Sequence, residues 1–312
     1  MFYRRPVVVT PISIFYLRDM NYLIYLAYGL ADIRNEAFYS ILSYDEVAPR
    51  RPDTQLLIYT DDAAAFQQVL GHREDTIYPA VEPEQWQTWR GAVNKVYLLK
   101  IGILEHAATH YPGNLLFLDT DTIWRLDPRP LFAQIEAGSF FMHQNEGRLA
   151  IGNTLSRKVY KHLRGLEWPS GGHILRVTPN TELFNSGIIA FRSDKAYLLQ
   201  EVMTLAEQLY AAYNKHMMEQ LAWSLRFASE GPIADVPNYL WHYWNLKDAR
   251  PVITQVVGKY AESSHQELLR QLQELNLPAL HQQELAYRNL PGWQRTLRKL
   301  IGRRWKMPTF NI

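Results

Sequence analysis

The feature that most constrains the fold is a short apolar run that leads directly into two aspartates, LLFLDTDTIW at residues 115–124. Such a run is typical of a strand buried on both faces in a sheet covered by helices. Strand geometry puts Asp119 and Asp121 on one face, at the carboxyl edge where ligands of α/β sheets bind. Because neighbouring carboxylates repel unless a cation lies between them, the pair predicts an Mg²⁺ or Mn²⁺ site. A helix cap followed by a turn residue is the alternative.

The order of the remaining elements favours the α/β class. Strands and helices alternate over the first 230 residues, which indicates a mostly parallel sheet flanked by helices. The expected strands are residues 12–17, 55–60, 76–78, 114–120, 139–143 and 183–192. The expected helices are residues 22–42, one capped by Thr60 or Asp61, 85–110, 194–213, 215–228, 262–275 and 282–306. Because only helices are expected after Lys247, we divide the chain into an α/β domain at 1–250 and a C-terminal helical appendage at 251–312.

The composition is that of a globular protein without covalent cross-links. The chain has 312 residues, 47% of them hydrophobic and 21% charged, and a chain of this length buries about 75% of its extended surface. Cysteine is absent, which excludes disulfides, thiolate zinc sites, iron–sulfur clusters and cysteine nucleophiles and fits a cytoplasmic location. The apolar stretch at 7–17 contains Pro11 and is too short to span a bilayer. We interpret it as a buried strand, with a signal peptide as the alternative.

Basic charge is concentrated near the end of the sequence. The formal net charge is +2, yet six basic residues and no acidic one lie from Arg295 to Lys306, so the rest carries 27 basic against 31 acidic residues. A nucleic-acid binder spreads basic charge over its main body, so no nucleic-acid partner is expected. Apolar residues recur among the basic ones at helical spacing: Trp293, Leu297, Leu300, Ile301 and Trp305. This pattern predicts a basic amphipathic helix that lies on an anionic membrane. Packing of the stripe on the α/β domain is the alternative.

Three further segments carry candidate functional residues. In TELFNSGIIAFRS, a polar triplet beginning at Asn185 interrupts an apolar strand, which is typical of a bulge or of a ligand's close approach. In HMMEQLAWSLRF, Glu219 and Gln220 open a helix, where an acid also favours the helix dipole. In PNYLWHYWNLKD, His242 lies among aromatic residues five positions before Lys247, and its nitrogen would favour Mn²⁺ over Mg²⁺. For each segment, a purely structural role is the alternative.

Taken in order, these four segments resemble the retaining GT-A glycosyltransferases of family 8, the glycogenin and lipopolysaccharide galactosyltransferase family. The segment RDMNYLIYLAYGL at 18–30 is also similar to that family's opening strand-to-helix turn, which holds the uracil ring. The resemblance covers residues 12–250. It implies a Rossmann-like GT-A fold and a metal-dependent enzyme that moves a hexose from a nucleotide sugar, expected to be a UDP-sugar, to a glycan or lipid-linked acceptor with retention.

The resemblance also implies roles for individual residues. The implied metal ligands are Asp119, Asp121 and His242, with Mn²⁺ or Mg²⁺ as the ion. The implied contacts to the nucleotide-sugar donor are Asp19 and Asn21 for uridine, Lys247 for the diphosphate and Lys95 for the donor phosphates. The metal ligand Asp119 is also implied as a donor contact. The implied residues around the reacting sugar are Asn185, which faces it, and the pair Glu219 and Gln220 beneath the anomeric carbon. The same family implies a cytoplasmic enzyme, peripheral on the inner face of the membrane, that builds cell-surface glycans.

The sequence departs from the family pattern near its last motif. Asn245 stands where the family has glycine, the interval from His242 to Lys247 is one residue shorter, and a following Pro-Trp pair is missing. Glu219 stands where aspartate is usual. Two alternatives therefore stay open: an inverting GT-A enzyme with Glu219 as the general base, and a non-catalytic glycan-binding relative. A nucleotidyltransferase is disfavoured because residues 18–28 contain no glycine for a phosphate loop.

Overall fold

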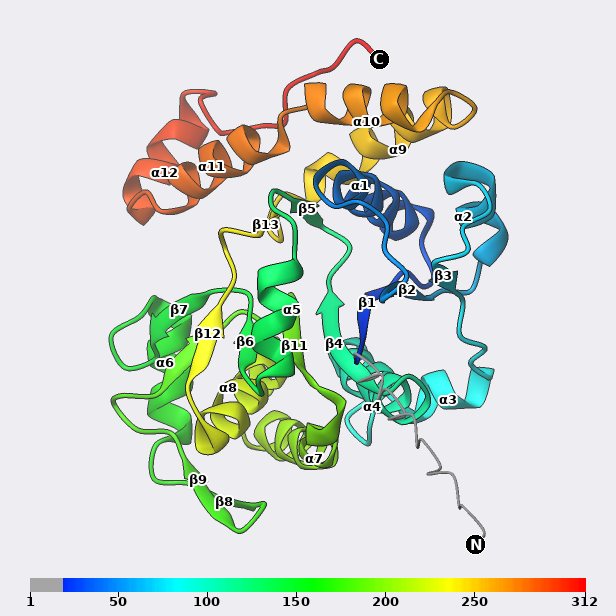
Figure 1. Cartoon of the computed structure of the whole chain (residues 1–312). Helices are drawn as coiled ribbons and strands as arrows, with labels where there is room; N and C mark the ends of the chain where they lie inside the picture. Colours follow the sequence, from blue (N-terminus) through cyan, green and yellow to red (C-terminus); the bar gives the residue numbers. More distant parts are fainter. Residues whose placement is uncertain (1–18) are drawn as a thin grey trace, which may run out of the picture.

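The structure is a computed structural model that describes residues 19–312 (Figure 1). It confirms the α/β class: a seven-stranded, mostly parallel sheet has the order β12-β6-β11-β4-β1-β2-β3 and is flanked by helices. Its strands are β1 (Met20–Leu26), β2 (Thr54–Tyr59), β3 (Thr76–Ile77), β4 (Gly113–Leu118), β6 (Phe140–Met142), β11 (Ile188–Arg192) and β12 (Ile233–Asp235). Strands β4, β1, β2 and β3 run parallel, whereas β11 runs antiparallel to both β4 and β6.

Three short ribbons, twelve α-helices and three short 3₁₀ helices complete the secondary structure of the described part of the chain. The ribbons are β5 (Thr122–Trp124) with β13 (Leu240–His242), β7 (Asn145–Arg148) with β10 (Glu182–Phe184), and β8 (Glu167–Ser170) with β9 (His173–Arg176). The helices are α1 (Ala31–Val47), α2 (Ala63–Leu70), α3 (Pro83–Thr88), α4 (Leu99–His110), α5 (Arg129–Glu136), α6 (Thr154–Leu163), α7 (Tyr197–Ala212), α8 (Met218–Glu230), α9 (Arg250–Tyr260), α10 (His265–Glu274), α11 (Leu277–Arg288) and α12 (Gly292–Leu300). None of the described helices is both long and apolar enough to cross a bilayer.

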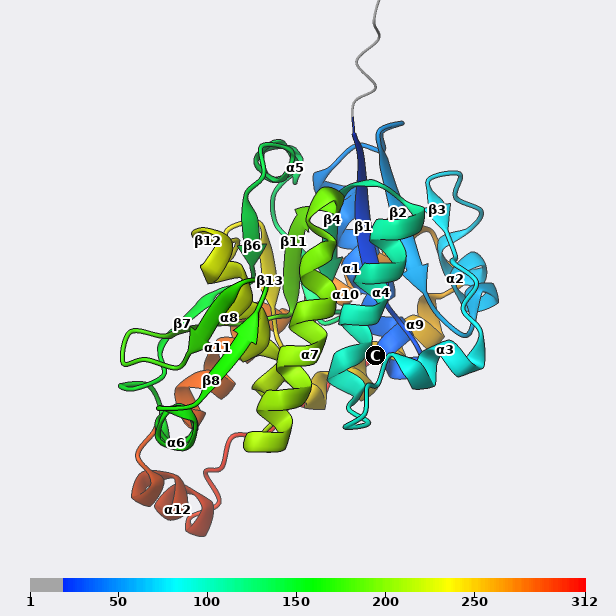
Figure 2. The same ribbon diagram turned by 90° about the horizontal axis from the view of Figure 1, so that it is seen from below.

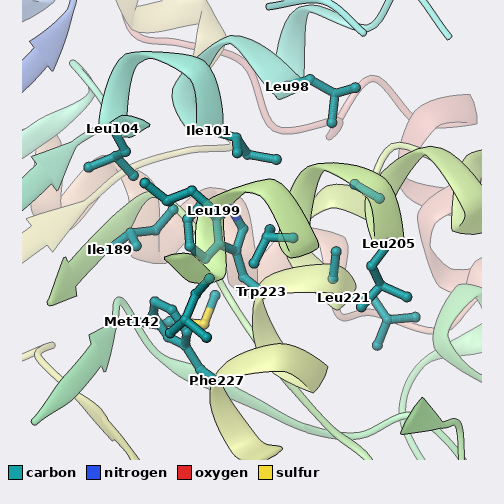
Figure 3. Packing of buried hydrophobic residues seen from close by; sticks show 14 of the residues in the cluster. Leu98, Ile101, Leu104, Met142, Ile189, Leu199, Leu205, Leu221, Trp223 and Phe227 are labelled. Atoms are coloured by element: carbon teal, nitrogen blue, oxygen red, sulfur yellow. The ribbon is translucent and has the colours of Figure 1, made fainter. Parts of the chain in front are cut away.

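The sheet separates two hydrophobic cores because its strands bury alternate residues on opposite faces. In β4, Leu115 and Phe117 belong to the core beneath α4, α7 and α8, while Leu116 and Leu118 belong to the core beneath α1, α2 and α9. Figure 3 shows the first core, where labelled residues such as Trp223 of α8 pack together. Burial on both faces explains why these strands are apolar without interruption.

Several predicted elements need correction. Residues 22–42 are not one helix: β1 ends at Leu26 and α1 begins at Ala31, and the apolar start of the segment is a strand buried on both sides. Residues 85–110 form two α-helices separated by a turn with positive φ at Gly91 and Asn94. The cap of α2 is Asp62, one residue later than expected. The predicted strand at 12–17 and the signal-peptide alternative lie outside the described residues.

The C-terminal helices also differ in detail from the expectation. Helix α9 was not predicted and packs against α1, and the predicted helix at 282–306 divides into α11 and α12. After α12 the chain returns along the second core, where four residues are partly buried: Trp305, Met307, Phe310 and Ile312. Trp305 therefore does not belong to the apolar stripe of α12.

Candidate active site

The first part of the site lies where β4 ends and the ribbon of β5 and β13 begins. The backbone amide of Asp119 donates to the carbonyl of Gly187 at 2.7 Å, which fixes the turn after β4. Thr122 in β5 pairs with His242 in β13, so the ribbon delivers the imidazole to the two carboxylates. Ligand atoms of Asp119, Asp121 and His242 all lie within 4.8 Å of one another. Two carboxylate oxygens and an imidazole nitrogen are a fitting donor set for Mn²⁺ or Mg²⁺.

The imidazole of His242 is held on three sides. Its Nε2 atom faces Asp121 Oδ1 at 3.1 Å and Asp119 Oδ2 at 3.9 Å, and its Nδ1 atom lies 3.4 Å from Nδ1 of His143. Burial, aided by His242, lowers the pKa of His143 to about 3, so His143 is neutral at pH 7. A Cβ atom on Gly187 would lie only 2.1 Å from the His242 ring, so this position needs glycine. The arrangement directs Nε2 at the carboxylates.

Two lysines balance the charge of the carboxylates. Lys247 Nζ donates to Asp121 Oδ2 at 2.7 Å, and Lys100 Nζ donates to Asp119 Oδ1 at 3.3 Å and to the Ser186 carbonyl at 3.0 Å. Burial alone would raise the pKa of Asp121, but His242 and Lys247 hold it well below its usual range. Burial would lower the pKa of Lys100, but the neighbouring carboxylates, Asp119 first, raise it. Asp121 and Lys100 are therefore charged at neutral pH, and the amine of Lys247 lies beside them.

A second group of side chains surrounds the polar interruption between β10 and β11. Ser186 Oγ donates to Glu219 Oε2 at 2.9 Å, while Glu219 Oε1 is buried without a hydrogen-bond partner among the described residues. Burial raises the pKa of Glu219 to about 7, partly opposed by Lys100. Glu219 is only 2% exposed, so it lies beneath the site surface.

Two amides meet at a carboxylate for which the sequence gives no local signal, Glu146. Asn185 Nδ2 donates to Glu146 Oε1 at 3.2 Å, and Gln220 Nε2 donates to Glu146 Oε2 at 2.8 Å. Asn185 Oδ1 accepts from the amide of Gly187 at 2.9 Å. Glu146 lies in β7 and is exposed. This group, in which only Glu146 is exposed, adjoins the cluster of Asp119, Asp121 and His242 through Gly187, whose backbone contacts Asp119.

The predicted uridine contacts, Asp19 and Asn21, lie elsewhere and need correction. Asn21 pairs in register with Asn114 at the start of β4, whereas Asp119 follows the end of that strand. Asp19 forms an ion pair with Arg192 at 3.0 Å, and Asn21 accepts from Asn114 at 3.0 Å. Both residues are therefore at the opposite edge of the sheet from Asp119.

Lys95 also requires correction. Its amine lies 5.6 Å from the ring of Tyr210, and its residue immediately precedes the short 3₁₀ turn before α4. The basic residue that reaches the carboxylates is Lys100, in the first turn of α4. Sequence spacing alone did not separate the two lysines, because the position at which α4 begins was unknown.

A buried ion pair supports the cluster from the opposite side. Glu36 of α1 accepts from Arg250 Nε at 3.0 Å and from Thr120 Oγ1 at 3.4 Å. Burial, with a contribution from Asp121, raises the pKa of Glu36 to about 7. These partners are more than 80 residues apart in sequence, and no local pattern marks them.

The comparisons with known proteins give structural likenesses only. No family model matches the chain, and no curated protein sequence matches it. Among solved structures it is similar to mouse xyloside xylosyltransferase 1, with a TM-score of 0.45 and 14% identity over 69% of this chain and 84% of that one. It is also similar to an active-site mutant of LgtC, with a TM-score of 0.46 and 12% identity over 76% of this chain and 95% of that one. The likeness to the glycosyltransferase GlyE of Streptococcus pneumoniae TIGR4 has a TM-score of 0.47 and 11% identity over 83% of this chain and 64% of that one. Identities of 11–14% are too low to carry the role of any residue across.

Proposed function

We propose that this chain is a metal-dependent glycosyltransferase that moves a hexose from a UDP-sugar to a glycan or glycolipid acceptor. The observation that carries the proposal is the convergence of Asp119, Asp121 and His242 with the amines of Lys247 and Lys100 at the carboxyl edge of the sheet. Breaking a bond between sugar and phosphate leaves a nucleoside diphosphate, whose growing negative charge must be neutralised. Carboxylates that hold a divalent ion, with lysines beside them, provide this neutralisation.

Asp119, Asp121 and His242 would hold the ion, which when bound supplies positive charge to the leaving diphosphate. The side chain of Lys247 is about half exposed, at 53%, so its amine can turn from Asp121 to a phosphate oxygen. Lys100 is buried and keeps Asp119 oriented through its second contact, the carbonyl of Ser186. These roles place the diphosphate over the turn after β4.

The amide pair suits the sugar and favours retention. Gln220, which is half-buried, and Asn185, which is 8% exposed, both donate to the exposed carboxylate of Glu146, and a hexose would bind beside this carboxylate. A neighbouring amide oxygen stabilises an oxocarbenium-like carbon from the face opposite the leaving group. An inverting reaction needs a base that reaches the acceptor hydroxyl. Glu219 is buried beneath Ser186, which disfavours it as that base, and Glu146 is the exposed carboxylate available instead.

We also propose that α12 contacts an anionic membrane. Its apolar side chains are open to solvent, with Trp293 67% and Leu300 78% exposed, and Arg295, Arg298 and Lys299 lie among them. In Figure 2, β1 begins at the top of the view and α12 lies at the bottom, past the edge of the sheet where β1 ends. A membrane that contacts α12 would therefore lie near the carboxyl edge of the sheet, where the proposed active site is. A lipid-linked acceptor in that membrane could then reach the site. Charge reversal of these three basic residues should abolish flotation with anionic vesicles at low salt, and unchanged flotation would contradict the proposal.

The catalytic proposal is tested by nucleotide release. The purified chain is incubated with individual UDP-sugars and Mn²⁺, and free UDP is measured with and without excess EDTA. We expect release with at least one donor and its loss in EDTA, and NMR of the product anomer then reports retention or inversion. Absence of release with every donor, together with absence of a donor-induced thermal shift, would favour the non-catalytic alternative.

A further inference from the structure

Side chains of helix α11 form hydrogen bonds with the loop that joins His242 to Lys247. Asn245, in the middle of this loop, donates from Nδ2 to Glu284 Oε2 of α11. Arg288 Nη2 donates to the backbone carbonyl of Asn245 at 3.3 Å. Arg288 Nε also donates to Glu284 Oε1 at 2.7 Å. One residue of the loop is thus held through both its side chain and its backbone by two paired side chains of one helix.

The contact between Asn245 and Glu284 is buried, whereas the side chain of Arg288 is 49% exposed, and both helix residues lie on one face of α11. Asn245 is 5% exposed and Glu284 is 8% exposed. His281, three residues before Glu284 on the same helix face, packs edge-on against Trp241, the neighbour of His242, with ring centroids 5.6 Å apart. Buried polar contacts of this kind are costly to break, because each leaves an unsatisfied group. The loop is therefore fixed at both Trp241 and Asn245.

The loop held by α11 has at its two ends His242 and Lys247, which belong to the proposed site. His242 and Lys247 flank Asn245 in sequence, and both contact Asp121, at 3.1 Å and 2.7 Å. Displacement of Asn245 would move both contacts together. Asn245 also stands where the resembling family has glycine, which offers no side chain for a helix to hold. In this chain the side-chain amide of Asn245 is present, and it binds Glu284 of α11.

We propose that α11 is a positioning element of the metal site, and that Glu284 and Arg288 are positioning residues for His242 and Lys247. This inference rests on the proposed function for the identity of the bound ion. Groups that orient metal ligands from outside the coordination sphere typically contribute 10–100-fold to metal affinity. The helical extension would then belong to the catalytic unit, although the sequence suggested a boundary near residue 250.

The test compares Glu284→Ala, Glu284→Gln and a matched control. The control is Glu267→Ala on α10, which removes a similar Glu–Arg pair, 2.7 Å long and exposed, in the same extension. Two properties are measured: hydrogen exchange of residues 240–250 without metal, and Mn²⁺ binding by electron paramagnetic resonance. We expect Glu284→Ala to accelerate exchange in this loop selectively and to weaken Mn²⁺ binding 10–100-fold. Glu284→Gln retains an acceptor for Asn245, so we expect an intermediate effect, and the control should match the wild type.

The outcomes separate this inference from the proposed function. Wild-type exchange and wild-type Mn²⁺ affinity in Glu284→Ala would overturn the positioning role. Exchange that rises equally throughout the α/β domain would also overturn it, because α11 would then be a general packing element. If Glu284→Ala loosens the loop selectively but the wild type binds no Mn²⁺, the positioning role stands and the proposed metal chemistry fails.

Discussion

The metal cluster and the amide pair are built in contrasting ways. The candidate metal ligands Asp119, Asp121 and His242 follow or end strands, and the pairing of β5 with β13 sets His242 opposite the residue after Asp121. Asn185 and Gln220 instead meet on the exposed carboxylate of Glu146, at the margin of a two-stranded ribbon. The first group is preorganised by the sheet, as charge stabilisation requires. In the second group only Glu146 is exposed, while Gln220 is half-buried and Asn185 is buried.

The largest expected effect is that of Asp121→Asn. This change preserves shape but removes the charge that lies between His242 and Lys247. We expect UDP release to fall by about a hundredfold or more. Asp127→Asn, at the opposite edge of the sheet, is the control. Full activity of the wild type in excess EDTA would contradict a metal-dependent role for this cluster.

A substitution at Gly187 tests whether the position of the His242 imidazole is fixed as closely as the structure implies. A Cβ atom on residue 187 would lie 2.1 Å from Cε1 and 2.5 Å from Nδ1 of His242, so Gly187→Ala should displace the imidazole. We expect Mn²⁺ affinity to fall about 10–100-fold in a titration. Gly231→Ala, where a Cβ atom meets nothing within 4 Å, provides the matched control. Equal affinities in the two variants would show that the cluster tolerates displacement.

Substitutions in and around the amide pair, Asn185 and Gln220, should lower turnover without lowering the affinity for the nucleotide. We expect Gln220→Ala and Glu146→Ala to lower turnover about tenfold, and Glu219→Ala to lower it as well, while UDP affinity stays near that of the wild type. This is the pattern of contacts made only in the transition state. If UDP affinity falls as much as turnover, these residues line the nucleotide pocket instead, and the contrast between the two groups disappears.

The smallest expected effect is on the pH dependence of stability. Burial raises the pKa of Glu219 to about 7, whereas a glutamate in the unfolded chain has a pKa of about 4.3. Between these values the folded protein holds a proton that the unfolded chain has released, so Glu219 makes stability fall as pH rises. Glu219→Gln should therefore gain stability relative to the wild type between pH 4.5 and pH 8 in urea unfolding with EDTA present. A constant difference across this range would contradict the burial of an ionisable group here.

The sequence predicted that Asp119, Asp121 and His242 lie together, because these residues carry local signals. An apolar strand that ends in two aspartates, and a histidine shortly before a lysine, are visible without knowledge of tertiary contacts. The α/β class followed from the alternation of strands and helices. The start of β1 was missed because a strand buried on both faces has no polar period and resembles the buried part of a helix.

The supporting residues were not predictable for a different reason. Glu146, Lys100 and the pair of Glu36 with Arg250 act through contacts between segments distant in sequence. An isolated glutamate or lysine carries no pattern that distinguishes it from a solvated one. Asp19 and Asn21 show the opposite error, since a matching local pattern lay at the wrong end of its strand.

The pairing of β5 with β13 has a consequence for synthesis of the protein. Asp121 and His242 are 121 residues apart in sequence, and at 5–20 residues per second the ribosome needs roughly 6 to 24 s to cover that interval. During this time Asp121 has neither the imidazole nor the amine of Lys247 to compensate its charge, so its carboxylate must stay hydrated or bind other cations. Arrival of the segment from β13 to α9 is therefore the event that allows the end of β4 to close. We expect a ribosome-bound chain that stops before residue 240 to be cleaved by protease at the turn after β4, and one extended past residue 290 to resist it.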